Sequence, residues 1–371
     1  MRYRVLSLDG GGQLEMTSTL LMIEIEKQRP GFLARTDMIA GTSAGAMVAL
    51  ILATQDDPAN LLPQAEVLWE KFFELSMNSL GGTLLGLVGL GALFTNQKLE
   101  EYLAQPDLLG DKTLGQLRKK VIITSFNLEG VDFSTGAKTW KPKVYDNFGA
   151  NNPDQMEKAV DVALRSSAAP IFFPILDGHV DGGVFANHPA MVAISKVFHD
   201  WRLGHHDHDE GVPLPEAEPG PLHDPVQDYL GDLKVLSIGV GENNNYIPVE
   251  DANWGYLKWI LDPFRPLLVV NALLRGSTSA VDFQCRNLLP HGSYHRLNPF
   301  YSRNAPIPFM VNTEDIKRTV QSPETQTLVS RTIEWLDASG WFELDDDEIA
   351  AGAAATGDTP APEPVAPEAA A

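Results

Sequence analysis

Short apolar runs alternate with segments of helical periodicity along most of the chain. The apolar runs predict strands at residues 4–8, 38–40, 121–126, 139–145, 174–180 and 234–238. Apolar positions that recur at helical spacing predict helices at residues 14–28, 46–53, 60–76, 96–104 and 155–166. The run at 139–145 alternates more between apolar and polar residues, so we expect it at an edge of the sheet. Strands that alternate with helices predict an α/β fold, in which a mostly parallel central sheet has helices on both faces.

Two segments depart from this pattern. Residues 204–229 are rich in His, Asp, Glu and Pro, and residues 345–371 are acidic and then rich in Ala, Pro and Glu. The adjacent histidines and aspartates at 205–209 could hold a transition metal, but ligands without a scaffold are more typical of a solvated surface insertion. The tail lacks the large apolar side chains of a packed core, so we expect it to be disordered. We therefore predict one folded domain over residues 1–344, with the insertion at about 204–229, and a disordered tail over 345–371.

The 371-residue chain carries a formal net charge of −21 at pH 7. This acidity argues against binding to nucleic acid and against electrostatic docking on anionic lipid, because both require a basic face. The single cysteine, Cys285, excludes an intramolecular disulfide and a cysteine metal cluster. The sequence has neither the apolar region of a signal peptide near residue 1 nor a run of about 18 apolar residues. We expect a cytoplasmic protein without a membrane span, or one exported by a non-classical route.

The segment Gly41-Thr42-Ser43-Ala44-Gly45 lies between a predicted strand and a predicted helix. A nucleophile elbow requires this order, because glycines on both sides of the serine let neighbouring backbone pass close to the turn. The helix would begin under the serine, and its N-terminal dipole favours negative charge that develops there. Ser43 is therefore the candidate nucleophile, with Gly41 and Gly45 as the glycines of the elbow.

Two further glycine-rich loops follow predicted strands. They are Asp9-Gly10-Gly11-Gly12 and Asp181-Gly182-Gly183. Because ligands bind at the carboxyl ends of strands in a parallel sheet, we expect both loops to lie near Ser43. Three consecutive glycines can turn several N–H groups toward one point, which suits an oxyanion or a phosphate. A nucleotide site is disfavoured, since the glycines are followed neither by G-x-G-x-x-G spacing nor by a Lys-Ser/Thr pair.

The nucleophile requires a base, and Asp181 is the best-placed candidate. The histidines at 179, 188, 291 and 295 have no motif around them, whereas Asp181 stands between a strand and two glycines. A carboxylate is a weak base toward a hydroxyl group, so Asp181 must be partly desolvated and within hydrogen-bonding reach of Ser43 Oγ. On its own, Asp181-Gly182-Gly183 would read as an ordinary tight turn. Its occurrence together with Ser43 and the glycine loop favours a hydrolytic site.

These motifs resemble those of the patatin-like phospholipases, whose pattern is a D-G-G-G loop, a G-x-S-x-G elbow and a D-G-G/A aspartate. Residues 165–174, 181–190 and 236–241 match further blocks of the family, so the resemblance covers roughly residues 4–300 in the family's order. It implies a patatin-like α/β fold that hydrolyses lipid esters, as a phospholipase A, a lysophospholipase or a non-specific carboxylester lipase.

The resemblance also assigns roles to individual residues. It implies Ser43 as nucleophile and Asp181 as the base of a Ser-Asp dyad without histidine, with Gly182 and Gly183 forming the turn after the aspartate. Gly10, Gly11 and Gly12 would supply the oxyanion hole. The reaction would pass through an acyl-enzyme and needs no metal or organic cofactor.

One departure from the family pattern bears on the substrate. Family members usually continue the glycine loop with x-Arg/Lys-Gly, whereas this chain has Gln13-Leu14-Glu15. Leucine at the basic position, with an acid beside it, weakens the case for a charged phospholipid and leaves room for neutral esters such as galactolipids or acylglycerols. Arg165, Arg275 and Arg286 are the arginines that could replace the missing charge.

The apolar, glycine-rich residues 80–94 are the candidate for a mobile cap that lines the acyl pocket or transiently touches a bilayer. The alternative is a buried loop that packs on the sheet. A lipase of this kind could also require a protein activator. The rival function is a catalytically impaired lipid- or protein-binding module on the same fold, which would retain an acyl chain without turnover.

Overall fold

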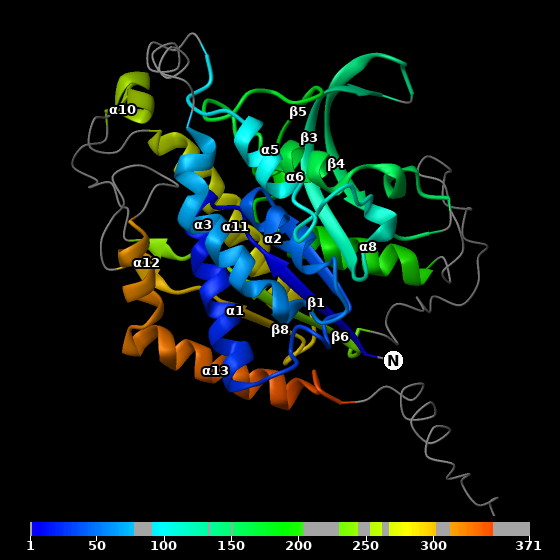
Figure 1. Cartoon of the computed structure of the whole chain (residues 1–371), viewed down its shortest axis with the longest axis vertical. Helices are drawn as coiled ribbons and strands as arrows, with labels where there is room; N and C mark the ends of the chain where they lie inside the picture. Colours follow the sequence, from blue (N-terminus) through cyan, green and yellow to red (C-terminus); the bar gives the residue numbers. More distant parts are fainter. Residues whose placement is uncertain are drawn as a thin grey trace, which may run out of the picture.

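A seven-stranded sheet runs through the centre of the protein in a computed structural model of the chain (Figure 1). Its strands are β1 (Tyr3–Leu8), β2 (Met38–Thr42), β3 (Lys120–Val131), β4 (Lys138–Asp146), β5 (His179–Asp181), β6 (Leu233–Ile238) and β8 (Tyr294–Leu297). They lie in the order β4-β3-β2-β1-β6-β8, and β5 pairs with β3. β4 and β5 are antiparallel to β3 and every other pairing is parallel, which confirms the predicted mostly parallel sheet with β4 at its edge.

The structure describes residues 2–77, 91–132, 134–149, 151–202, 230–243, 253–261, 267–301 and 312–343. The insertion predicted at 204–229 and the tail predicted at 345–371 lie outside these residues, as does most of the apolar segment 80–94. Among the helices within the described ranges, none combines the length and the hydropathy that a membrane span requires.

The central strands are buried on both faces because successive side chains point to opposite sides of the sheet. Leu6 of β1 lies in register with Ile39 of β2, and both belong to the apolar core on one face. Their neighbours Val5 and Met38, also in register, belong to the core on the other face. This burial on both sides explains why these strands appear in the sequence as continuous apolar runs.

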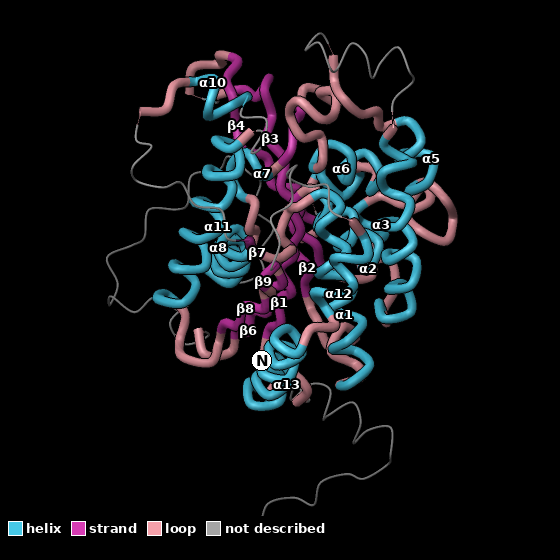
Figure 2. The backbone as a smooth tube through the Cα atoms, turned by 90° about the vertical axis from the view of Figure 1, so that its left-hand side faces the viewer, coloured by secondary structure: helices cyan, strands magenta, loops and turns pink. Residues whose placement is uncertain are grey.

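Helices cover both faces, and Figure 2 shows the sheet between the two helical layers. The larger layer contains α1 (Met16–Gln28), α2 (Ala44–Leu52), α3 (Leu62–Ser76), α5 (Gln97–Leu103), α6 (Ala159–Ser166), α12 (Thr313–Val320) and α13 (Pro323–Ser339). The opposite layer contains α8 (Ala190–Arg202) and α11 (Leu268–Leu288). The predicted helices belong to the larger layer, whereas sequence patterns did not predict the two that form the opposite one.

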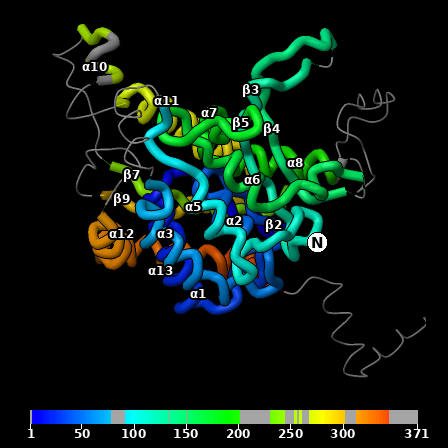
Figure 3. The backbone as a smooth tube through the Cα atoms, turned by 45° about the horizontal axis from the view of Figure 1, so that its top comes forward, coloured from blue at the N-terminus to red at the C-terminus, as the bar shows by residue number. Residues whose placement is uncertain are grey.

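Short elements complete the fold, several of them around the carboxyl ends of the strands. They are the 3-10 helices Gly12–Glu15, Pro58–Leu61, Leu114–Gln116 and Pro153–Met156, the helices α7 (Gly183–Ala186) and α10 (Tyr256–Leu261), and the two-stranded sheet of β7 (Glu242–Asn243) and β9 (Phe300–Tyr301). Figure 3, which brings this end forward, shows α7, α10 and the hairpin formed by β3 and β4.

Some predicted elements are shorter than the sequence pattern suggested. The strand predicted at 174–180 is wrong in extent, because only His179–Asp181 forms a strand. Asp177 and Gly178 both have positive φ values, of 49° and 75°, and form a tight turn between Leu176 and His179. The helix predicted at 155–166 begins only at Ala159, after a separate 3-10 turn. The helix predicted at 14–28 likewise begins with a 3-10 turn.

Candidate active site

Ser43 occupies the sharp turn between β2 and α2, in the strained conformation that an elbow requires. Its backbone has φ 56° and ψ −124°, a combination that residues with a Cβ rarely adopt. The turn closes only with glycines: a Cβ on Gly41 would lie 2.5 Å from the Gly45 carbonyl oxygen, and one on Gly45 would lie 2.5 Å from that of Asp9. The Ser43 N–H donates to Ser166 Oγ at 2.9 Å. The local sequence therefore forms the turn that the motif predicted.

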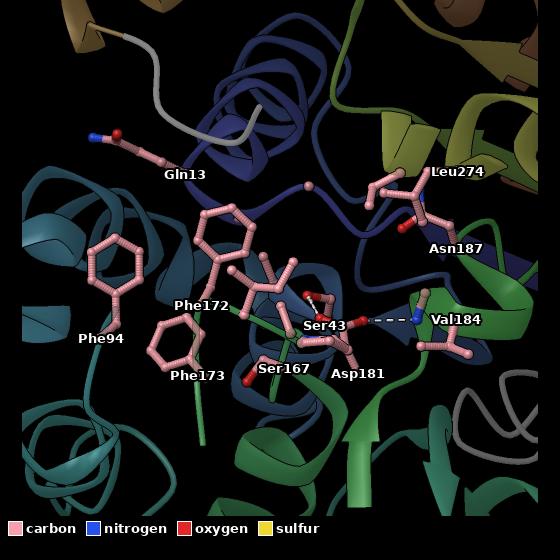
Figure 4. Close-up of a pocket in the computed structure, with 18 of the residues that line it drawn as sticks. Gln13, Ser43, Phe94, Ser167, Phe172, Phe173, Asp181, Val184, Asn187 and Leu274 are labelled. Atoms are coloured by element: carbon pink, nitrogen blue, oxygen red, sulfur yellow. Dashed lines mark hydrogen bonds between the residues drawn. The ribbon is translucent and has the colours of Figure 1, made fainter. Parts of the chain in front are cut away.

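Ser43 Oγ donates a hydrogen bond to Asp181 Oδ2 at 2.5 Å (Figure 4). Asp181 ends β5, and the pairing of this strand with β3 brings the carboxylate to the elbow although the two residues are 138 positions apart. The other carboxylate oxygen, Oδ1, accepts the Gly183 N–H at 2.7 Å. Both side chains are buried but lie at a pocket wall. The structure thus brings the predicted nucleophile and the predicted base into contact.

The electrostatics of Asp181 suit a base. Burial raises the pKa of its carboxyl group to about 6, and the hydrogen bonds from Ser43 and from the Gly183 N–H oppose this rise. A carboxylate is a stronger base when burial makes its charge costly, because proton uptake then relieves desolvation. The carboxylate still predominates at neutral pH, so the group is poised to accept a proton.

The glycine loop lies beside the elbow, but its three N–H groups are not equivalent. The Gly10 N–H donates to the Asn187 carbonyl oxygen at 2.9 Å, so it is already occupied. Gly11 and Gly12 line the pocket together with Ser43, and within the described part of the chain their N–H groups form no hydrogen bond. Gly12 has φ 56°. Of the three predicted oxyanion donors, the geometry leaves Gly11 and Gly12 available because Asn187 engages Gly10.

A buried ion pair, which sequence patterns did not predict, holds the start of this loop. Arg296 of β8 donates to both carboxylate oxygens of Asp9, at 3.0 and 2.5 Å, and also to Ser237 Oγ at 2.7 Å. His188 Nε2 lies 2.8 Å from Ser237 Oγ, and burial lowers the pKa of this imidazole to about 4, so it is neutral. These groups fix Asp9 directly before the glycines. Asp9 and Arg296 are 287 positions apart, which explains why no local pattern identified the pair.

The pocket beside Ser43 has a volume of about 470 Å³ and is lined mainly by apolar side chains. Figure 4 shows Phe94, Phe172 and Phe173 on one side of Ser43, and Val184 and Leu274 on the other. Phe94 packs against Phe172 and Phe173 with ring centroids 6.1 and 5.4 Å apart. The nucleophile therefore lies between an aromatic wall and an aliphatic wall, in a space suited to an apolar chain.

The arginines considered as replacements for the missing basic residue lie elsewhere. Arg165 pairs with Glu157 and Asp177, and Arg286 pairs with Asp282. Arg275 donates to the Asn243 carbonyl oxygen and pairs with Glu242. None of the three is among the described residues that line the pocket.

Glu15, the acid of the altered loop, is fully buried and accepts a hydrogen bond from Ser18. Burial raises the pKa of its carboxyl group well above the ordinary value. Gln13 lines the pocket, whereas Glu15 is not among the described lining residues. The acid beside Leu14 is therefore buried and does not belong to the described pocket wall. No group of three or more metal-ligating side chains lies in the described ranges.

The family model for patatin-like phospholipases matches residues 6–194, which include the glycine loop, the elbow and Asp181. The cGAMP-activated phospholipase of Pseudomonas aeruginosa is 32% identical over 202 residues, which cover 53% of this chain and 56% of that protein. Patatin-like protein 4 of Arabidopsis thaliana is 27% identical over 280 residues, which cover 69% of this chain and 64% of that protein.

Among solved structures, VipD from Legionella pneumophila aligns with a TM-score of 0.37 and 15% sequence identity, covering 89% of this chain and 67% of that one. This likeness is too low to bear on the site. The family assignment rests instead on the family model that matches residues 6–194.

Proposed function

The chain belongs to the patatin-like phospholipase family, and from that premise we propose that it is a lipid acyl hydrolase in which Ser43 and Asp181 form the catalytic dyad. The observation that carries the proposal is the 2.5 Å hydrogen bond from Ser43 Oγ to Asp181 Oδ2 at the wall of an apolar pocket. A serine that donates to a desolvated carboxylate has the partner it needs to act as a nucleophile.

In the first half of the reaction, Ser43 Oγ attacks the ester carbonyl carbon while its proton passes to Asp181 Oδ2. The carbonyl oxygen becomes an oxyanion, which the N–H groups of Gly11 and Gly12 and the N-terminus of α2 stabilise. The tetrahedral intermediate then collapses, the bond to the alcohol oxygen breaks, and Asp181 returns the proton to the leaving alcohol. The acyl group remains as an ester on Ser43.

In the second half, a water molecule attacks the acyl-enzyme carbonyl carbon and gives a proton to Asp181. The second tetrahedral intermediate occupies the same oxyanion site. Its collapse breaks the bond to Ser43 Oγ, which regains the proton, and releases the carboxylic acid. One carboxylate therefore serves both half-reactions by taking up and returning a proton.

The contact between nucleophile and base supports the hydrolase over the rival binding module. A protein that only retained acyl chains would have no need to keep a strained serine against a buried carboxylate. Strain at Ser43 and desolvation at Asp181 both cost free energy of folding, and such costs are typical of catalytic sites.

We extend the proposal to the substrate: the site favours esters of neutral lipids, such as acylglycerols or galactolipids. Among the described residues that line the pocket, Asp181 is the one charged side chain. A phosphate near the scissile ester would be desolvated there without a cationic partner, which is unfavourable. This agrees with the leucine at position 14, where the family usually has Arg or Lys.

The first test is hydrolysis of a short-chain nitrophenyl ester by the full chain and by Ser43→Ala and Asp181→Asn. We expect each substitution to lower kcat/KM by about a thousandfold or more, because each removes a reacting group. Ser195→Ala, on the exposed side of α8, is the matched control and should leave the rate unchanged. Retention of the wild-type rate in Ser43→Ala would overturn the proposed mechanism.

The second test compares a diacylglycerol with a phosphatidylcholine of the same acyl chains, each in uncharged detergent micelles. We expect faster hydrolysis of the diacylglycerol. A higher kcat/KM for the phospholipid would contradict the substrate proposal while leaving the dyad intact.

A further inference from the structure

An apolar rim surrounds the mouth of the pocket. Phe73 of α3, Ile171, Val184 of α7 and Leu273 of α11 line the pocket, yet each side chain is also between 43% and 68% exposed. They come from four separate segments of the chain. Water-facing apolar side chains are unremarkable when scattered, but contiguous ones around an opening mark a contact surface.

Backbone strain at the rim also supports a contact surface. Ile171 has φ 77°, a conformation that β-branched residues avoid. The Ala169 carbonyl oxygen accepts the N–H groups of Phe172 and Phe173, and the Ile171 carbonyl oxygen accepts the Leu93 N–H. This turn places Phe172 and Phe173 in the pocket wall and leaves Ile171 exposed to water. Such strain is typical of functional sites, so it supports a role for this exposed turn.

The apolar surface continues from the rim onto the hairpin of β3 and β4. Trp140 of β4 is 73% exposed. Its ring meets the ring of Phe126 of β3 edge-on, with the ring centroids 6.5 Å apart. The centroids of Phe126 and Phe185, the residue after Val184, are 6.3 Å apart. Figure 3 shows this hairpin, α7 and the start of α11 at the same end of the molecule. Trp140 is therefore the outermost member of one aromatic path that leads to the mouth.

We propose that the rim and Trp140 form a docking face for a lipid surface of low net charge, which seats the pocket mouth against the lipid so that an ester can reach Ser43. The inference rests on the proposed function for the identity of the occupant. The continuity of the face with an apolar pocket favours lipid over a protein partner. Tryptophan is suited to the boundary between water and lipid because its ring is apolar and its N–H is polar.

The net charge of the chain indicates which kind of lipid surface this face would bind. The formal net charge of −21 disfavours approach to anionic headgroups, so we expect burial of apolar side chains to drive the docking. Apolar burial depends little on moderate salt, whereas electrostatic docking weakens as ions screen the charges. We therefore expect binding to phosphatidylcholine vesicles that persists at high salt, and weaker binding to phosphatidylserine vesicles.

The experiment is co-flotation of the full chain with phosphatidylcholine vesicles. Trp140→Ala should lower the partition coefficient by about tenfold, because the ring loses its apolar contact with lipid. The same variant should hydrolyse a soluble short-chain ester at the wild-type rate. Trp140→Phe should recover most of the binding. Phe283→Ala is the matched control, since this exposed aromatic residue lies on α11 roughly 15 Å along the helix from Leu273, and it should bind like the wild type.

Three results would overturn the docking face: no flotation of the full chain, equal flotation of Trp140→Ala and the wild type, or tighter and salt-sensitive binding to phosphatidylserine. Flotation measures binding to the vesicles and does not depend on ester hydrolysis. If the wild type failed to hydrolyse any ester, the proposed function would fail, and the flotation result would still decide the docking face.

Discussion

At the scale of single residues, the site depends on groups whose burial costs stability. Asp181 is a carboxylate removed from water, Ser43 has a strained backbone, and Asp9 is a buried charge that Arg296 compensates. Each feature is unfavourable alone and is maintained by a specific partner. Substitution of the partner should therefore have effects larger than those of an average surface change.

The raised pKa of Asp181 predicts the pH dependence of the reaction. Only the ionised carboxylate can accept the Ser43 proton, so activity should be lost as pH falls through about 6, the value to which burial raises this pKa. The kcat/KM for a soluble ester should fall about tenfold per pH unit well below that midpoint and level off above it. Circular dichroism at each pH separates this loss from unfolding. A midpoint near the ordinary value of 3.8 would contradict the assignment of Asp181 as the base.

The ion pair under the glycine loop predicts an unequal response of two arginines. Arg296→Met should lower the free energy of unfolding by about 3–5 kcal/mol, because it leaves the Asp9 carboxylate buried without its partner. Arg118→Met removes a pair with Asp56 in which both side chains are well exposed, and should cost less than about 1 kcal/mol. Urea denaturation of both variants measures the difference. Similar stability of the two variants would show that the loop does not depend on Arg296.

At the scale of elements, local patterns predicted the parts of the fold whose signals are local. The β1, β2, β3 and β6 strands appear as apolar runs because both of their faces are buried, and the elbow appears because its glycines are required within five residues. The strand predicted at 174–180 begins too early, because Asp177 and Gly178 form a turn before β5. An Asp-Gly dipeptide is typical of hairpin turns.

Contacts between distant segments could not be predicted in this way. The aromatic wall joins Phe94 to Phe172 and Phe173, and no periodicity links these positions. The second helical layer, α8 and α11, was missed, although α8 follows directly from the block that contains Asp181. The occupation of the Gly10 N–H by Asn187 also depends on how these segments pack. The sequence thus predicts the candidate reacting groups, while tertiary packing determines their supports and the pocket walls.

The close packing at the elbow predicts opposite effects of two glycine substitutions. Gly45→Ala should lower the free energy of unfolding by about 1–3 kcal/mol and reduce ester hydrolysis, because its Cβ would lie 2.5 Å from the Asp9 carbonyl oxygen and 2.6 Å from that of Leu8. Gly276→Ala, within α11, meets no atom within 4 Å and should raise stability by about 0.5–1 kcal/mol. Thermal denaturation of both variants measures these changes in stability. Equal effects of the two changes would contradict the packing described for the elbow.

At the scale of the whole molecule, the candidate catalytic groups and the pocket lie at one end of the sheet. The elbow follows β2, the glycine loop follows β1, and Asp181 ends β5, so that three segments distant in sequence meet at one pocket. The hairpin that carries Trp140, α7 and the start of α11 lie at the same end (Figure 3), where the proposed lipid surface would meet the pocket mouth. The acidic net charge of the chain makes apolar contact, rather than charge, the expected basis of that docking.

The central claim is that Ser43 is a nucleophile activated by Asp181, and covalent labelling with a fluorophosphonate tests it most directly. Mass spectrometry of the digested protein should find one adduct, on Ser43, in the wild type. The adduct should be absent from Ser43→Ala and should form at least about a hundredfold more slowly in Asp181→Asn, because the base is lost. An adduct on another serine, or labelling of Asp181→Asn at the wild-type rate, would contradict the account.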